Sequence, residues 1–427
     1  MNPDQELTDY ERITVVGAGV TGQAVAEVLT RENKEVFVTD SGKINDEIQD
    51  KFTKNQVEFE ENEHTEKSLE TELVVVSPGV PLENPVIQGA RSKGIPVVGE
   101  IELAYWLSSS KKIVAVTGTN GKTTTVNLIT AILDYKGKPA LACGNIGTPF
   151  VKIAPSLTSA DIPVVEVSSY QLQQIVNFKP KVAILLNLTS DHIEHHGSFE
   201  KYREAKLGIF CNQDENDYAI VNRKFEYGVP NKKPELIRFN RKSFPGVNLL
   251  AHQQENLGAA VEAINCITEG EKVSRFPPSV VKQGFEISHR LETIAEIETR
   301  KFINDSKATN PAATIAAING FKEPIRLLLG GQSKMADYES LIRTIENSSV
   351  VSVYLFGAAR GKIEGIMNEM EFENYFLFSS LKEATEKAFR NSRPGEIIML
   401  SPACSSFDQF DDYKQRGREF VRTVETL

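Results

Sequence analysis

The stretch AVTGTNGKTTT, residues 115–125, has most of what a phosphate-binding loop needs. Gly118 and Gly121 let the backbone curl so that N–H groups face an anion, and a helix starting there adds its positive end. Lys122 reaches terminal phosphates, and one of the two threonines after it ligates Mg²⁺. The first glycine usual in such loops is missing. Gly-Lys-Thr-Thr after an apolar run still predicts phosphate binding.

A second glycine cluster, GAGVTG at residues 17–22, follows the apolar run RITVV and fits the G-x-G-x-x-G pattern. Asp40 ends the next apolar run, about where an acid holds a ribose hydroxyl in a dinucleotide-binding turn. The string alone is compatible with NAD, with another nucleotide or with a simple tight turn. An aspartate at this place is also an ordinary helix cap.

Acidic, histidine and lysine side chains follow two later apolar runs. Glu166, in VEVSSYQL, lies at the end of an apolar strand, where a carboxylate coordinates Mg²⁺ beside a phosphate loop or simply forms a cap or an ion pair. The string TSDHIEHHG contains Asp191, His192, Glu194 and two more histidines, but not at the spacing of a zinc site, so partly exposed loop residues are expected. Lys206 lies in an amphipathic pattern and by that pattern is a solvated lysine.

Three polar loops follow apolar runs in the last third of the chain: NDSKATNP, LLLGGQSK and LSPACSSFDQFDDYKQRG. Because the carboxyl ends of parallel strands share one edge of a sheet, we expect these loops to meet at a ligand-binding edge. Cys404 has only hydroxyls beside it in sequence, so it is expected to be a packed thiol and not a nucleophile.

Apolar runs alternate with helical segments along the whole chain, which is typical of parallel sheets covered on both faces. The alternation restarts at KKIVAVTG, and a reversal rich in Pro and Gly marks a further boundary near residue 287. We predict an α/β protein of three domains. They are a Rossmann-like domain over 1–108, a central α/β domain of the P-loop type over 109–287, and a second Rossmann-like domain over 288–427.

The composition bounds the possible partners. The chain has 427 residues and a formal net charge of −10, which argues against a nucleic-acid partner. No apolar run reaches the ~20 residues that span a bilayer, and the polar N-terminus is unlike a signal peptide. Its four cysteines are scattered without a C-x-x-C pair. We expect a cytoplasmic protein, a monomer, without membrane contact.

The order of the strings TGTNGKTT, GNIGTP, EVSSYQL, TSDHIEHHG, EAKLGIF, NDSKATNP and SPACSSFDQFDDYKQRG resembles that of the Mur ligases over nearly the whole chain. The last two strings are similar to those of members that add D-glutamate, and the family's phosphate loop has this same form. The resemblance implies an ATP-dependent amide ligase of peptidoglycan synthesis that acts on UDP-N-acetylmuramoyl-L-alanine and D-glutamate. It implies that ATP phosphorylates the alanine carboxylate and that the amine of D-glutamate attacks the acyl phosphate.

The resemblance also implies roles for individual residues. ATP-side residues are Gly118, Thr119, Asn120, Gly121, Lys122, Thr123, Thr124, Asn145, Asn256, Arg290 and Asp305. Ligands of two Mg²⁺ ions are Thr123, Glu166, His192 and Lys206, the lysine as a carbamate formed with CO₂. The UDP portion falls to Thr21, Asp40, Ser41 and Ser77, and D-glutamate to Lys334, Ser406, Phe407 and Tyr413. Lys307 and Thr309 face the reacting groups, and the catalytic set is Lys122, His192, Lys206 and Lys307.

Gln253, Gln332 and Glu194 depart from the residues usual in the family, which leaves individual contacts open but not the reaction class. Alternatives within the superfamily are a ligase adding another residue and a folylpolyglutamate synthase. An NAD-dependent oxidoreductase would leave the phosphate loop unexplained. An ATP-driven binding switch would leave Glu166, His192 and the three C-terminal loops without a purpose.

Overall fold

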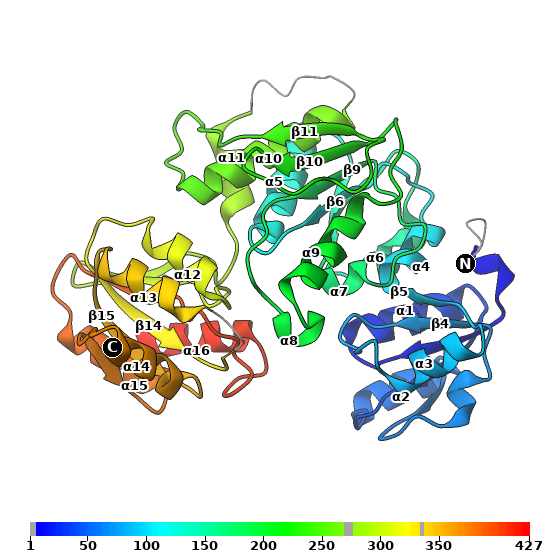
Figure 1. Cartoon of the computed structure of the whole chain (residues 1–427), viewed down its shortest axis with the longest axis horizontal. Helices are drawn as coiled ribbons and strands as arrows, with labels where there is room; N and C mark the ends of the chain where they lie inside the picture. Colours follow the sequence, from blue (N-terminus) through cyan, green and yellow to red (C-terminus); the bar gives the residue numbers. More distant parts are fainter. Residues whose placement is uncertain (1–5, 269–275, 334–336) are drawn as a thin grey trace. The chain divides into compact units, whose positions relative to one another are not determined.

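The protein has an α/β fold built on three sheets, as predicted (Figure 1). The computed structural model describes residues 6–268, 276–333 and 337–427. The chain divides into two compact units. The first is Met1–Leu188 with Glu200–Val247 and Gln253–Gly284, and the second is Thr189–Phe199 with Asn248–His252 and Phe285–Leu427. Every helix in these described stretches is too short or too polar to cross a bilayer.

The first sheet lies in the blue part of the chain in Figure 1 and has the order β3-β2-β1-β4-β5, with all strands parallel. Short β-branched runs such as ITVV bury four successive side chains of β1, as expected for a sheet covered on both faces. Val16 pairs with both Thr39 and Val76, so the residues that follow β1, β2 and β4 meet at one edge. The elements are β1 (Arg12–Val16), α1 (Val20–Arg31), β2 (Glu35–Thr39), α2 (Asp46–Lys54), β3 (Glu58–Glu60), β4 (Leu73–Val76), α3 (Pro85–Ser92), β5 (Val97–Gly99) and α4 (Glu100–Leu107).

The second sheet is also entirely parallel, in the order β11-β10-β9-β6-β8-β7. Because Val116 pairs with Glu166 and Thr117 with Leu185, the ends of β6, β8 and β9 lie together. Its strands are β6 (Val114–Thr117), β7 (Ala140–Gly144), β8 (Ile162–Glu166), β9 (Val182–Leu185), β10 (Tyr218–Asn222) and β11 (Glu235–Phe239). The helices between Lys122 and Phe285 are α5 (Lys122–Tyr135), α6 (Phe150–Ile153), α7 (Ser169–Leu172), α8 (Ile193–His196), α9 (Phe199–Leu207), α10 (Ala251–Ile267) and α11 (Pro278–Phe285).

The third sheet, in the second unit, has the order β12-β13-β17-β14-β15-β16. Only the edge strand β12 runs antiparallel to its neighbour. Leu400 pairs with both Asn304 and Leu328, which brings the three C-terminal loops to one edge of this sheet. The elements are β12 (Glu292–Ile297), β13 (Arg300–Asn304), α12 (Pro311–Ile318), β14 (Ile325–Gly330), α13 (Tyr338–Glu346), β15 (Val350–Phe356), α14 (Arg360–Glu369), β16 (Tyr375–Leu377), α15 (Leu381–Asn391), β17 (Ile397–Leu400) and α16 (Tyr413–Glu425).

Two buried glutamates connect α4 to α6, to α7 and to the non-helical segment 176–178 that follows α7. Glu102 accepts the backbone N–H groups of residues 176–178 at 2.7 to 2.9 Å. Glu100 accepts the backbone N–H of Val151 at 2.7 Å and Nε2 of Gln171 at 3.3 Å. Burial raises the pKa of Glu100 from 4.5 to about 7, although these donors oppose the shift.

Candidate active site

The predicted phosphate loop connects β6 to α5. Gly118 and Gly121 have φ angles of +147° and +88°, which favour glycine because other residues are strained there. A Cβ added at Gly121 would lie only 2.4 Å from Oδ1 of Asn256 on α10. Gly121 is therefore required both by its own backbone and by its neighbour Asn256, whose role on the ATP side stays a prediction.

The loop is clamped by Asn187, two residues after β9. Asn187 accepts the backbone N–H of Asn120 at its Oδ1, 2.9 Å away, and donates from Nδ2 to the carbonyl of Asn120 at 3.0 Å. Its own carbonyl accepts the N–H of Thr119 at 3.1 Å. Nζ of Lys122 donates to the carbonyls of Gly118 and Thr119, both at 2.9 Å. Since the clamp uses the N–H groups of residues 119 and 120, the donors for an anion lie at the start of α5.

Glu166 connects the phosphate loop with Asn145. One carboxylate oxygen accepts Oγ1 of Thr123 at 2.7 Å, and the other accepts Nδ2 of Asn145 at 3.0 Å. In the part of the chain that the structure describes, no group of three or more His, Cys, Asp or Glu is placed to hold a metal ion. Thr123 and Glu166 nevertheless fit Mg²⁺, because this ion is usually held by one or two protein ligands together with substrate phosphates and water.

Lys206 is buried, with only 2% of the residue exposed. The prediction of a solvated lysine, made from the amphipathic pattern, is therefore wrong. Its Nζ donates to the carbonyl of Gly118 at 3.0 Å and to Oγ1 of Thr117 at 3.4 Å. It lies 5.0 Å from the ring centre of Tyr202, one helical turn earlier on α9. Tyr202 in turn contacts Oγ1 of Thr119 at 2.9 Å. The face of α9 that carries both residues packs on the phosphate loop, which is why the lysine is buried.

His192 has a positive φ of 54° and precedes the short helix α8, in the second unit. Its Nε2 is 3.7 Å from Oδ2 of Asp191, and its Nδ1 is 3.9 Å from Oε1 of Glu194. Oδ2 of Asp191 also accepts Nδ2 of Asn310, which comes from the NDSKATNP loop. His192 and His195 are partly exposed, as predicted, whereas His196 is buried and the segment forms the short helix α8 (Ile193–His196).

The C-terminal loops meet around Asp305. Its Oδ2 accepts Oγ of Ser401 at 2.9 Å, and its Oδ1 accepts the N–H of Leu291 at 3.2 Å. Burial raises the pKa of Asp305 to about 6, against the lowering effect of the Arg290 charge. Burial, with a smaller contribution from Arg290, lowers the pKa of His252 to about 4. The expected ATP-side residues Arg290 and Asp305 thus lie in one electrostatic neighbourhood.

The residues expected around D-glutamate lie in different surroundings. Ser406 is buried, whereas Phe407 is 69% exposed. Tyr413 is half-buried at the start of α16, and Nζ of Lys307 lies 5.6 Å from its ring centre. Thr309 donates its N–H to the carbonyl of Lys307 at 3.0 Å. Lys334 lies outside the described residues.

Cys404 is a packed thiol, as predicted. It is fully buried, and its Sγ lies 3.2 Å from the hydroxyl of Tyr338. Burial raises the pKa of the Cys404 thiol to about 11. Such a thiol stays protonated at neutral pH and is not a nucleophile.

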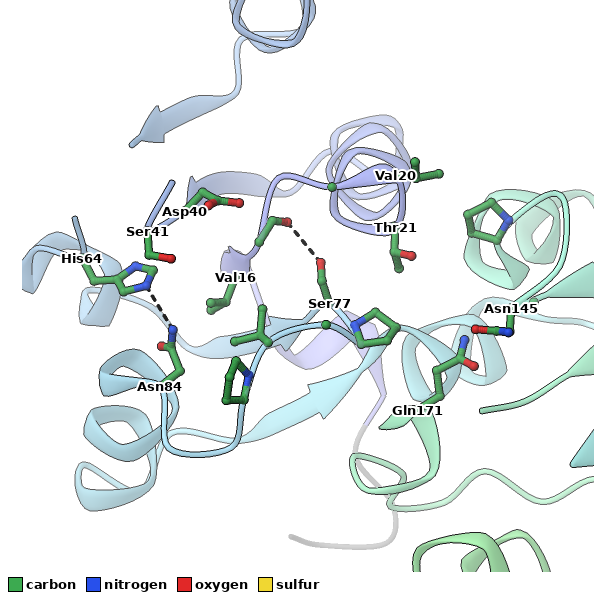
Figure 2. A pocket seen from close by; sticks show the side chains of 18 of the residues that line it. Val16, Val20, Thr21, Asp40, Ser41, His64, Ser77, Asn84, Asn145 and Gln171 are labelled. Atoms are coloured by element: carbon green, nitrogen blue, oxygen red, sulfur yellow. Dashed lines mark hydrogen bonds between the residues drawn. The ribbon is translucent and has the colours of Figure 1, made fainter. Parts of the chain in front are cut away.

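A cavity of about 520 Å³, called here the N-terminal pocket, opens at the edge of the first sheet (Figure 2). Its lining includes all four residues expected for the UDP portion: Thr21, Asp40, Ser41 and Ser77. Asp40 accepts the N–H groups of Ala18 and Gly42 at 2.7 and 2.8 Å, so it supports the glycine turn directly. Asn145 and Gln171 close one end of the pocket, and His64 and Asn84 close the other (Figure 2).

Three family models match the chain. They are described as the Mur ligase MurD-like N-terminal domain (residues 11–99), the Mur ligase middle domain (116–270) and the Mur ligase, glutamate ligase domain (289–404). The chain belongs to the Mur ligase family. Among curated relatives, the UDP-N-acetylmuramoylalanine--D-glutamate ligase of Natranaerobius thermophilus is 34% identical over 98% of this chain and 99% of its own length. The ligase of the same name from Koribacter versatilis is 36% identical over 98% of both chains.

Solved structures of other Mur ligases share the fold of this Mur ligase. The MurF ligase of Thermotoga maritima in complex with ADP superposes with a TM-score of 0.60 at 16% identity, covering 92% of this chain and 95% of that one. The UDP-N-acetylmuramate-alanine ligase of the same organism gives a TM-score of 0.59 at 17% identity, covering 97% and 99%. At such identities the likeness concerns the fold alone.

Sequence reasoning missed three residues that organise the sites of this Mur ligase. Asn187 clamps the phosphate loop, and its signal in the sequence is its place two residues after β9, the strand that pairs with β6. Arg416 is fully buried among the C-terminal loops, although a charged helix position gives no hint of this. His64 lines the N-terminal pocket from a polar connection that follows β3. No local pattern distinguishes it.

Proposed function

We propose that this Mur ligase uses ATP to join D-glutamate to UDP-N-acetylmuramoyl-L-alanine through an acyl phosphate of the alanine carboxylate, in the cytoplasm and as a monomer. Relatives named UDP-N-acetylmuramoylalanine--D-glutamate ligase match the chain over nearly its full length. The observation that carries the proposal is the position of Asn145. It lines the N-terminal pocket and also donates to Glu166 beside the phosphate loop, so a nucleotide in the pocket and a phosphate at the loop share a neighbour.

In this proposal the N-terminal pocket holds the uridine nucleotide. The N-terminus of α1, a helix of 12 residues with Gly19 as its N-cap and no capping side chain, faces the diphosphate with its positive end. Thr21, Asp40, Ser41 and Ser77 provide the polar groups around the rest of the UDP portion. The muramoyl-alanine end then lies toward Asn145 and the phosphate loop.

The phosphate loop and α5 take the ATP phosphates. A carboxylate and a triphosphate repel one another, so their approach must be neutralised. Lys122, which spans the loop through two carbonyls, supplies one positive charge. Mg²⁺, when bound, supplies charge neutralisation and orients the phosphates. Thr123 and Glu166 would hold it, and His192 is proposed for a second Mg²⁺ site.

Lys206 is proposed to act as a carbamate. An ammonium beside Mg²⁺ would be repelled, whereas a carbamate is an anion with two oxygens on a longer arm than Asp or Glu provides. Lys206 is buried against the phosphate loop, with its Nζ next to the carbonyl of Gly118. This burial supports the proposed role, because the side chain is not a solvent-exposed surface charge. Lys307 and Thr309 are proposed to face the reacting groups from the NDSKATNP loop.

The D-glutamate site is proposed at the C-terminal loops. Ser406 with its neighbouring backbone offers neutral donors for a carboxylate, and Lys334 a cation. Tyr413 adds an aromatic wall, and Phe407 is proposed to join it from its exposed position. Arg290, Asp305 and Asn256 are proposed contacts of ATP.

The deciding experiment measures phosphate release from ATP with each substrate omitted in turn. Release should require both UDP-N-acetylmuramoyl-L-alanine and D-glutamate, and mass spectrometry should find the amide product. L-glutamate, glycine and L-lysine serve as controls for the amino-acid site. ATP turnover that is indifferent to the two substrates would overturn the ligase proposal, and turnover with another amino acid would reassign the member of the family.

A further inference from the structure

His64, at the end of the N-terminal pocket opposite to Asn145, has both of its ring nitrogens engaged. Nδ1 lies 2.6 Å from Oγ1 of Thr39, and Nε2 lies 3.0 Å from Nδ2 of Asn84. The residue is half-buried. Its ring is therefore hydrogen-bonded to the protein at both nitrogens and still lines the pocket (Figure 2). Neither the glycine-turn motif nor the phosphate loop accounts for this arrangement.

The hydrogen bonds around His64 determine its tautomer. Oδ1 of Asn84 accepts the N–H of Val86 at 2.9 Å, as the cap of α3, so the amide NH₂ of Asn84 must be the group that faces His64. Nε2 of His64 is therefore an acceptor without a proton. The hydrogen bond from the N–H of Val86 to Oδ1 sets the orientation of the Asn84 amide.

The other nitrogen is fixed by Glu60. An ionised carboxylate only accepts, so the hydroxyl proton of Thr39 goes to Oε1 of Glu60 at 2.6 Å. The same carboxylate also accepts the N–H and the hydroxyl of Thr65. Oγ1 of Thr39 is thus left as an acceptor toward His64, and Nδ1 of His64 carries the proton. The imidazole is neutral, in one tautomer, with its ring orientation locked at both edges.

A ring bound at both edges has no N–H left to offer a ligand in the pocket. What it presents is a flat, rigid π face. Such a face recognises planar, conjugated groups and has little preference among the hydrogen-bonding edges of different bases. Because the ring is already ordered, contact with it costs little side-chain entropy.

The position of His64 determines which part of the nucleotide it meets. The acyl end must lie toward Asn145, because Asn145 adjoins Glu166 and the phosphate loop. The diphosphate lies in the middle, at the start of α1. The nucleoside therefore lies at the opposite end, which His64 and Asn84 close (Figure 2).

We infer that the imidazole face of His64, locked by Thr39 and Asn84, is the stacking wall for the uracil base of the nucleotide substrate. This inference rests on the proposed function, since it takes the N-terminal pocket to be the uridine nucleotide site. His64 then acts on binding of the nucleotide and not on the chemical step.

The experiment is isothermal titration of the full chain with UDP, and with pyrophosphate as a probe that lacks the base. His64→Ala should raise the Kd of UDP about tenfold, as expected for the loss of one base–aromatic contact, and leave the Kd of pyrophosphate unchanged. His64→Phe keeps a π face and should stay within about threefold of the wild type. His64→Gln keeps polar atoms but no ring and should resemble the alanine variant. Circular dichroism checks that each variant is folded.

In turnover assays, His64→Ala should raise the KM for the nucleotide substrate with little change in kcat or in the KM for ATP. Unchanged UDP affinity in His64→Ala, or wild-type affinity in His64→Gln together with loss in His64→Phe, would overturn the inference while the ligase proposal stands. A wild-type protein that turns over its substrates but shows no affinity for UDP would also refute the stacking wall. Failure of the phosphate-release assay described above is a separate result and would refute the ligase proposal.

Discussion

Arg416 donates from Nη2 to the backbone carbonyl of Ser306 across 2.8 Å, although the two residues lie 110 positions apart in the sequence. Its Nε donates to Oγ of Ser306, and its Nη1 donates to the carbonyls of Cys404 and Ser405 at 3.0 and 3.2 Å. One fully buried guanidinium thus joins the NDSKATNP loop to the SPACSSF loop. Burial lowers the pKa of Arg416 to about 10, so it remains a cation at neutral pH.

Arg416→Met should lower the free energy of unfolding of the second unit by about 3 kcal/mol, because buried carbonyls lose their donors at roughly 1–3 kcal/mol each. Arg416→Lys keeps the positive charge but has a single side-chain nitrogen, so its free energy of unfolding should lie between those of the wild type and Arg416→Met. The control is Arg422→Met, an exposed position on the same helix, which should change stability by less than about 0.5 kcal/mol. Urea denaturation followed by circular dichroism measures both, and equal stability of the two methionine variants would contradict the role of Arg416.

Gly121→Ala should weaken ATP binding at least about tenfold. The φ of +88° strains any side chain by roughly 1–2 kcal/mol, and the new Cβ would also displace Asn256. Gly137→Ala is the matched control, since Gly137 has a φ of +68° but no atom within 4 Å of an added Cβ. Titration with a non-hydrolysable ATP analogue and Mg²⁺ measures both variants, and Gly137→Ala, beyond the far end of α5, should leave the affinity unchanged. Similar affinities in both variants would mean that ATP binding does not depend on glycine at position 121.

Lys206→Ala should lower turnover by more than about 100-fold, a loss of roughly 2.7 kcal/mol or more of transition-state stabilisation. Added formate or acetate should restore part of the activity, because a small carboxylate fills the place of the proposed carbamate. Lys206→Arg should remain inactive, since a guanidinium does not form a carbamate. Lys201→Ala, an exposed lysine on the same helix, is the control and should be fully active. Full activity in Lys206→Ala would refute the catalytic role of Lys206.

Glu100 should make stability depend on pH between its unfolded pKa of 4.5 and its folded pKa of about 7. A raised carboxyl pKa means that the folded state binds more protons in this window, so stability is lost as pH rises through it, by about 3 kcal/mol at most. Glu100→Gln cannot ionise and should gain on the wild type over the same range. The single tryptophan, Trp106 on the same helix, reports unfolding by fluorescence.

The measurement is the difference in unfolding free energy between the wild type and Glu100→Gln at pH 5, 6, 7 and 8, which cancels groups that titrate in both. Glu32→Gln, an exposed residue beyond α1, should show no such trend. A difference that stays constant across the four pH values would show that Glu100 is not held protonated by its burial between α4, Val151 and Gln171.

The sequence alone determined the features that short stretches encode. A β-branched run, a glycine turn and a helix are local, so the phosphate loop and the glycine turn before α1 could be placed. The succession of such units predicted an α/β protein of three domains. Strand order then follows from crossover connections, which explains why Asp40 and Ser77 meet Thr21 at one pocket.

Only the tertiary structure decided which charged side chains are buried and what they hold. The pattern around Lys206 is amphipathic, but only packing against the phosphate loop shows that the lysine faces inward. Arg416, Asn187 and His64 act through partners between 11 and 110 positions away, and no spacing in the chain records such pairs. Desolvation depends on every atom around a group, so the raised pKa of Glu100 and the locked ring of His64 arise only once distant segments have come together.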